Sequence, residues 1–469
     1  MMNHKLRFRP FGGAPVRPGS TLGGRSHEAV AERPKSSQRS RRSSLHAAAI
    51  CAAAALAGCQ GEPEDAVEDA EEEEVGAAEQ SLDLCLPPLN TPGEARRLFE
   101  KETFGGNGRT CLTCHKKGTG TLSPEDVQAR FAADPDDPLF SHDGSDDFQG
   151  HGVTRILEDA TILVRIPLPS NVKLANDPTA TSIVLRRGIP TTLNTPALDP
   201  VLMYDGRAPN LSEQARDAIH SHYQNTIEPT NNQLKLIAQH QKTPTFFSSA
   251  ALRFFANGGP PPKLPKGWTP AEKRGRQWLE DAPVPPAINS QTSRKGLCAL
   301  CHSGPMLNQT NGFGFFPLPP FPTAPEATKC DQPATAGTPV PAGRRFDTAL
   351  ISELNIGNEP KFSFLVKMPN GSTVALPPIA DPGRALITGN FQSFPSLNGD
   401  LFHFKIPTLW GIKKTAPYFH NNSSKTLEEM IEHYAVFFQR ITDCNIDGDP
   451  PLVMTAGDKA DLLAYLRLL

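Results

Sequence analysis

Apolar residues recur with a helical period in a few well-separated segments of the chain. Segments 93–104, 271–280 and 458–469 place apolar side chains three or four positions apart, which predicts amphipathic helices. A further helix is predicted over 423–438, where Thr426 and Glu429 have the spacing of a capping box. Runs that alternate between apolar and polar residues are few, so the pattern predicts a mainly α protein.

The N-terminal segment has the pattern of an export signal. Two arginines precede an apolar stretch at 45–57 that is too short to span a membrane as a mature helix. It ends in Leu-Ala-Gly-Cys at Cys59, which resembles a bacterial lipoprotein cleavage site. We therefore expect residues 1–58 to be a lipoprotein signal segment and Cys59 to carry lipid, which predicts a periplasmic, membrane-anchored protein, most simply on a Gram-negative outer membrane. A plain secretory signal and an uncleaved anchor are the alternatives.

Composition then divides the rest of the chain. Residues 59–83 are acidic and lack aromatic residues, which predicts a disordered tether. The 469 residues carry a net charge of −3, which gives no reason to expect nucleic acid as a partner. The high counts of proline (47) and glycine (37) indicate long loops. A Pro/Gly-rich stretch at 257–268 marks the predicted boundary between domains 84–262 and 263–469.

The nine cysteines include two copies of one motif. Cys111, Cys114 and His115 form a C-x-x-C-H pattern, and Cys298, Cys301 and His302 form a second. This spacing is the attachment pattern of a c-type haem, in which two thiols bond to the ring edge and the histidine binds the iron. A zinc site and a redox dithiol are the alternatives. We expect two covalently bound haems, with an amphipathic helix before each attachment loop.

Three other cysteines, Cys85, Cys330 and Cys444, leave room for at most one further intrachain disulfide. Cys330 with Cys444 is our prediction, since both fall in loops of the second half. A Pro-rich insertion over about 312–342 is expected to extend from the second domain.

Motifs between and after the two attachment sites give a resemblance. Segments 186–215 and 381–434 contain "DGRAPNLSEQA" and "TAPYFHNNSSKTLEE", and these are similar to the bacterial di-haem cytochrome c peroxidases, including their MauG branch. The resemblance implies two cytochrome c-like domains, each with one haem. It also implies reduction of hydrogen peroxide by electrons from a small periplasmic donor, a cytochrome c or a cupredoxin.

The resemblance assigns roles to individual residues. The haem on His115 would be the peroxidatic centre, and the haem on His302 would receive electrons. Gln214 matches a residue of the peroxide pocket. The family's pocket glutamate falls on Gln224, whereas Glu228 fits its local context if a short insertion is allowed. We predict Glu228 as the acid–base residue; the alternative is a solvated loop carboxylate.

Two tyrosines match positions that shape electron transfer. Tyr204 occupies the place of the family's tryptophan between the haems, although a packed core tyrosine is also compatible. Tyr434 falls on the position of the sixth ligand of the second haem, where peroxidases usually carry methionine and the MauG branch carries tyrosine. Met430 lies one helical turn before Tyr434 and is the alternative ligand.

The resemblance also implies a calcium ion held by the side chain of Asn194 and the backbone carbonyls of Thr415 and Pro417; alternatively, Asn194 caps a turn. Trp410 stands where the family has an arginine. A distal histidine for the first haem is not evident, although His142 or His151 could supply one.

Our expectation is a di-haem peroxidase. The alternatives are a MauG-like oxidase that modifies a protein or an organic substrate, and a lipid-anchored electron carrier without peroxide chemistry.

Overall fold

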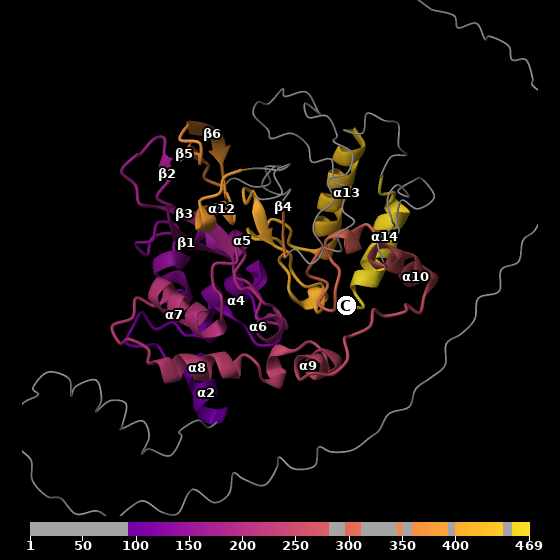
Figure 1. Cartoon of the computed structure of the whole chain (residues 1–469). Coiled ribbons are helices and arrows are strands. Elements are labelled where there is room, and N and C mark those ends of the chain that lie inside the picture. The colour runs from indigo at the N-terminus through magenta and orange to yellow at the C-terminus, as the bar shows by residue number, and fades with distance from the viewer. Residues whose placement is uncertain (1–91, 281–295, 311–344, 349–358, 393–398, 444–452) are drawn as a thin grey trace, which may run out of the picture. The chain divides into compact units, whose positions relative to one another are not determined.

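The computed structural model describes residues 92–280, 296–310, 345–348, 359–392, 399–443 and 453–469, all within one compact unit, Leu82–Leu469 (Figure 1). Several predictions lie outside the described residues. They concern the signal and tether at 1–83 with Cys59, the insertion at 312–342, and Cys85, Cys330 and Cys444.

Helices make up most of the regular structure. In chain order the α-helices are α2 (Pro92–Glu100), α3 (Cys111–Cys114), α4 (Pro124–Ala133), α5 (Thr154–Asp159), α6 (Thr195–Leu198), α7 (Leu211–His222), α8 (Asn231–His240), α9 (Ala250–Ala256), α10 (Pro270–Arg276), α12 (Ala385–Thr388), α13 (Leu427–Asp443) and α14 (Ala456–Leu466). Short 3-10 turns are η1 (Pro138–Phe140), η2 (His142–Gly144), η3 (Pro244–Phe246), η4 (Gln277–Leu279), η5 (Cys298–Leu300) and η6 (Ile412–Lys414).

The predicted helices are confirmed, with shifted ends. α2, α10, α13 and α14 fall within or across the segments whose periodicity predicted them. At the start of α13 the hydroxyl of Thr426 accepts the Glu429 N–H at 3.1 Å, while the Glu429 carboxylate accepts the N–H of Lys425 instead of that of Thr426. The capping box is thus half realised, with its second bond moved by one residue.

In the described part of the chain, three small antiparallel sheets accompany the helices and were not predicted. Their strands are β1 (Thr161–Pro167), β2 (Val172–Leu174), β3 (Ser182–Gly188), β4 (Phe346–Thr348), β5 (Phe362–Lys367), β6 (Thr373–Ile379) and β7 (His403–Lys405). β1 pairs with β3, β4 pairs with β7, and β5 lies between β2 and β6. The pairing Val172↔Val366 therefore joins the two sides of the predicted boundary at 262/263.

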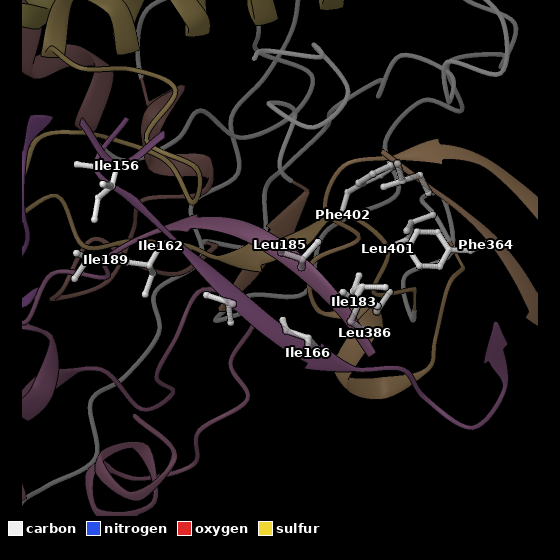
Figure 2. Packing of buried hydrophobic residues seen from close by; sticks show 14 of the residues in the cluster. Ile156, Ile162, Ile166, Ile183, Leu185, Ile189, Phe364, Leu386, Leu401 and Phe402 are labelled. Atoms are coloured by element: carbon white, nitrogen blue, oxygen red, sulfur yellow. The ribbon is translucent and has the colours of Figure 1, made fainter. Parts of the chain in front are cut away.

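The largest described core is built around β1 and β3. Figure 2 shows Ile162 and Ile166 of β1 near Ile183 and Leu185 of β3, with Phe364 of β5 in the same cluster. All five side chains are buried, and each full burial of this kind stabilises the fold by roughly 1.5–3 kcal/mol. Residues from both sides of the predicted boundary thus share one core, although the boundary itself stays a prediction.

Each attachment motif lies beside a group of packed helices. α8 packs against α2 and α7, and α14 packs against α10 and α13 (Figure 1). The first group packs against Cys111, and the second belongs to a core against which Cys298 and Cys301 pack. Within the described part of the chain, no helix combines the length and apolar character needed to cross a bilayer.

Candidate functional site: two matching attachment turns

The first C-x-x-C-H motif forms a single helical turn. The Thr113 hydroxyl accepts the N–H of Thr110 at 2.9 Å at the start of α3, and the N–H of His115 donates to Cys111 O at 2.9 Å at its end. His115 Nδ1 then donates to the carbonyl oxygen of Gly120 at 2.8 Å. Because a carbonyl only accepts, Nδ1 carries the proton and Nε2 keeps the lone pair that could bind a metal.

The second motif repeats these contacts. The N–H of His302 donates to Cys298 O at 2.7 Å, and His302 Nδ1 donates to the carbonyl oxygen of Leu307 at 2.9 Å. In both motifs the acceptor is five residues after the histidine. Both imidazoles are therefore fixed in the same tautomer, the one that suits a haem-iron ligand.

The backbone at the two acceptors is also the same. Gly120 has φ +71° and Leu307 has φ +51°, both in the left-handed region. A Cβ at Gly120 would lie 2.5 Å from Thr192 N, so glycine is required there. Leu307 adopts this conformation at a cost of about 1–2 kcal/mol, which indicates that the surrounding structure imposes the turn.

The four thiols fit attachment to a haem better than either alternative. None of them forms a disulfide. Burial raises the pKa of Cys111 and of Cys114 to about 11 and that of Cys298 to about 12, the opposite of what a redox thiolate needs. Among the described residues, no group of three or more Cys, His, Asp or Glu side chains could hold a metal ion, so the two pairs do not form a shared zinc site.

A buried ion network lies beside the first turn. Arg109 and Asp143 are each 1% exposed and form an ion pair, and Asp143 also binds His222 Nδ1. Arg109 donates further hydrogen bonds to the carbonyl oxygens of Pro138, Leu139 and Ser141 at 2.6–2.9 Å and to that of His222 at 3.4 Å. Burial opposes ionisation of Asp143, but its contacts with His222 and Arg109 outweigh it and hold its pKa below the ordinary value.

The end of α7 is tied to this attachment loop. Tyr223 donates from its hydroxyl to Cys111 Sγ at 3.2 Å, and Asn107 Nδ2 donates to the carbonyl oxygen of His222 at 3.1 Å. Burial lowers the pKa of His115. The last turn of α7 therefore lies beside the attachment loop at Cys111, and the loop residue Asn107 caps the carbonyl of His222.

The predicted pocket residues of the first site differ in how far their side chains are buried. Gln214 is half-buried on α7. Glu228 is exposed, with its carboxylate 2.9 Å from His220 Nε2. Gln224 is exposed too, and its Oε1 accepts a bond from Asn107 at 3.2 Å. Only Gln214 thus lies partly inside the protein, and the role of Glu228 stays a prediction.

The two candidate distal histidines also differ. His151 is 82% exposed and lies 2.8 Å from an Asp147 oxygen. His142 is mostly buried beside Asp143, and its Nδ1 has no hydrogen-bond partner among the described residues. His142 is therefore the better placed of the two for a ligand.

The second turn has an apolar setting. Cys298 and Cys301 pack against a core that includes Trp278, Met306 and Met430. Trp278 Nε1 is buried and finds no acceptor within the part of the chain that is described. A haem carboxylate is the kind of group that would satisfy such a donor, so the residues present fit a haem here as well.

Two residues that sequence reasoning did not select hold the second loop. Trp410 Nε1 donates to the carbonyl oxygen of Pro305 at 2.9 Å, and the Thr408 hydroxyl donates to that of Met306 at 2.7 Å. In the sequence, Trp410 stands out only because it replaces an arginine of the similar family. A large buried donor in place of a charge is the signal that could have pointed to this role.

Both candidate sixth ligands belong to this second core. Met430 is buried and Tyr434 is half-buried, and each packs in the cluster that contains Cys298 and Cys301. Tyr434 also has an edge contact with Phe437, with the ring centroids 6.4 Å apart. The structure brings both side chains to the second site and leaves the choice between them as a prediction.

A second buried ion network joins the segment between the two motifs to a residue that follows the second motif. Arg187 binds Asp205 at 2.5 Å and Asp381 at 2.8 Å, and all three are at most 2% exposed. Burial raises the pKa of the neighbouring Tyr204, and the charge of Arg187 opposes this shift. Tyr204 is half-buried, and its backbone carbonyl accepts the Lys405 N–H at 2.6 Å. It lies where both halves of the chain meet, and its role in electron transfer stays a prediction.

The predicted calcium ligands include a residue with a clear structural task. Asn194 is fully buried, accepts the N–H of Ser248 at 2.7 Å and donates to Trp410 O at 2.8 Å. It makes no side-chain cap to α6. Asn194 therefore links distant segments, with one lone pair of its oxygen already used. A calcium ion with Thr415 and Pro417 stays a prediction.

Comparisons with known proteins give structural neighbours alone. Neither a family model nor a curated protein matches the chain. A MauG-like protein associated with microbial copper homeostasis aligns with TM-score 0.41 and 17% identity, over 82% of this chain and 91% of that chain. The diheme peroxidase BthA from Burkholderia thailandensis E264 aligns with TM-score 0.39 and 15% identity, over 81% and 86%. These two neighbours are a MauG-like protein and a diheme peroxidase.

Proposed function

We propose that the protein is a di-haem c-type peroxidase that reduces hydrogen peroxide to water with electrons from a small periplasmic donor. The observation that supports this most directly is the pair of matching turns, in which His115 and His302 each donate from Nδ1 to a carbonyl five residues downstream. Each peroxide would take two electrons and two protons and give two water molecules. When bound, the haems would supply the iron that accepts electrons and reacts with peroxide.

The residues of this chain divide the work between the two sites. Cys111, Cys114 and His115 would hold the first haem, next to charged and polar side chains that can bind peroxide and move protons. Cys298 and Cys301, with His302, would hold the second haem in an apolar core, which excludes water and suits electron storage.

Gln214 and Tyr204 have supporting roles in this proposal. Gln214 is half-buried on α7, and its amide would orient peroxide or water without carrying a proton itself. Burial disfavours ionisation of Tyr204, so its phenol stays neutral and would serve as an aromatic bridge for electrons. Calcium at Asn194 and lipid on Cys59 are further parts of the proposal.

A MauG-like oxidation of a protein or organic substrate is the second candidate. It is favoured by Tyr434, an oxygen donor that lies in the core of the second site. An oxygen ligand stabilises the oxidised state of iron, whereas the thioether of Met430 would favour the reduced state. The identity of this one ligand therefore bears on which chemistry the protein performs.

The test is to reduce the purified holoprotein halfway, add hydrogen peroxide, and follow both the haem spectrum and the oxidation of a reduced donor cytochrome. We expect two donor molecules to be oxidised per peroxide. A persistent oxidised spectrum without donor turnover would favour the MauG-like candidate. The absence of any spectral change would favour the alternative of an electron carrier without peroxide chemistry. The Tyr434→Met and Met430→Leu variants, compared by spectroscopy, identify the ligand of the second haem.

A further inference from the structure

We propose that His222 is the acid–base residue of the first haem site, the role that the resemblance gives to Glu228. This inference rests on the proposed peroxidase function and deepens it. His222 would take the proton from the peroxide oxygen that binds and return it to the oxygen that leaves. The residue then ends the step in its starting state, and the two electrons come from the donor.

His222 is held in the orientation that this role requires. Its Nδ1 binds the carboxylate of Asp143, which is itself 1% exposed and paired with Arg109. A carboxylate accepts, so Nδ1 carries the proton and Nε2 is the basic atom. No described residue forms a hydrogen bond with Nε2. The arrangement leaves one basic nitrogen available beside the attachment loop.

The position of His222 on α7 is tied to the haem attachment residues. Its carbonyl oxygen accepts bonds from Asn107 and Arg109, and the next residue, Tyr223, donates to Cys111 Sγ. Gln214 lies two turns earlier on α7, at a spacing that puts both residues on one side of the helix. The amide of Gln214 and the imidazole of His222 therefore lie on the same side of one helix.

The network around His222 has two tasks. Arg109 holds the carbonyls of residues 138, 139 and 141, which is a structural task. The carboxylate of Asp143 also fixes the histidine, an arrangement that orients bases in hydrolases and metal sites. Glu228 lacks such support, since its side chain is 65% exposed and is paired only with His220.

The decisive variant is His222→Asn. Its amide keeps a donor towards Asp143 at about the place of Nδ1, but it provides no base, so the ion network is retained. The matched control is His220→Gln, because His220 lies on the same helix and is 44% exposed. Glu228→Gln tests the competing assignment. All variants are prepared with haem, and haem content per chain is measured first.

Two readouts separate this inference from the proposed function. The first is the rate of reaction with peroxide, which we expect to fall by about 10²–10⁴-fold in His222→Asn. The second is cyanide association with the oxidised first haem, which needs a base to remove the proton of hydrogen cyanide and should slow by about tenfold or more. His220→Gln should stay within about twofold in both.

Three results would overturn the proposal. One is a wild-type rate of cyanide association in His222→Asn. Another is a fall in the peroxide and cyanide rates in Glu228→Gln instead of in His222→Asn. The third is a low-spin first haem that becomes high-spin in His222→Asn, which would make His222 an iron ligand.

If the wild type does not react with peroxide, the peroxidase proposal fails while the cyanide rates still test His222. If His222→Asn does not bind two haems, the same measurements on His222→Gln decide.

Discussion

The two attachment turns share their local geometry and differ in what surrounds them. In each, a histidine donates to a left-handed residue five positions later. The residues that precede the two motifs differ, however. Two positions before Cys111 lies the buried Arg109, whereas two positions before Cys298 lies Gly296. One position before these cysteines, half-buried Thr110 stands in the first and buried Leu297 in the second.

Under the proposed function, this difference would let one motif serve two tasks. The C-x-x-C-H turn would fix where a haem is bonded and how its histidine is oriented. The residues just outside it would decide whether that haem meets charges, as near Asp143, or apolar side chains, as near Trp278 and Met306. Polar groups support proton transfer, whereas an apolar setting tunes the electron affinity of the iron.

The largest expected effect comes from removing one attachment at a time. Replacing Cys111 and Cys114 by alanine should leave one haem per chain and abolish peroxide reduction, because the reactive centre is lost. The same change at Cys298 and Cys301 should also leave one haem, but it should abolish electron transfer from the reduced donor to the oxidised protein in the absence of peroxide, which the first double variant should retain. Haem content is measured after denaturation in pyridine. Equal behaviour of the two double variants towards the donor would contradict the division of roles.

Breaking the buried network should destabilise the first site strongly. Arg109→Met leaves Asp143 buried without its arginine, which we expect to cost about 3–5 kcal/mol. Denaturant unfolding of the holoprotein measures this. The control is Arg97→Met, since Arg97 is 45% exposed and pairs with Glu94 at 2.9 Å, and such surface pairs contribute about 0.2–1 kcal/mol. Similar losses in both variants would show that the network does not stabilise the fold.

A smaller effect concerns folding stability, which should depend on pH through the protonation of Glu359. Burial raises its pKa from the ordinary 4.5 to about 7, and the nearby Asp381 adds to this. The folded state therefore holds the proton more tightly than the unfolded chain, so stability falls as the pH rises from about 4.5 through about 7. Glu359→Gln should be more stable than wild type at pH 8 by about 1–3 kcal/mol and nearly equal at pH 4. An equal difference at both values would contradict this.

The smallest effect should be confined to the second site. Trp410→Phe removes the bond to the Pro305 carbonyl, at a cost of about 1 kcal/mol. It should also alter the spectrum of the second haem alone, because this bond holds the loop after His302. Trp268→Phe is the control, since Trp268 is 88% exposed. A change at the first haem would show that the two sites are not separate in this respect.

Local patterns in the sequence predicted local structure well. The helical periods gave α2, α13 and α14, and the attachment motifs are indeed two matching turns. The strand β1 was missed because several of its neighbouring residues, such as Leu163 and Val164, are all buried. Its apolar run therefore lacks the alternation that identifies a strand with one exposed face. In β3 alternate residues are buried, but the consecutive apolar residues Ile183, Val184 and Leu185 hide this alternation in the sequence.

The polar surroundings of the first site could not be predicted in this way. Asp143 meets Arg109 across 34 residues and His222 across 79 residues. No spacing rule relates positions so far apart, and only the packing of α7 against the attachment loop brings them together. The resemblance pointed instead to Glu228, whose carboxylate is exposed in this chain.

The central claim is that each chain carries two haems bonded through thioethers, and the mass of the denatured mature protein tests it most directly. Because thioether bonds survive denaturation, the account predicts a mass equal to the mature polypeptide with its Cys59 lipid plus two haems. Removal of the Cys298 and Cys301 thiols should lower this to one haem. A mass equal to the bare polypeptide, or to the polypeptide with a single haem in the wild type, would contradict the account.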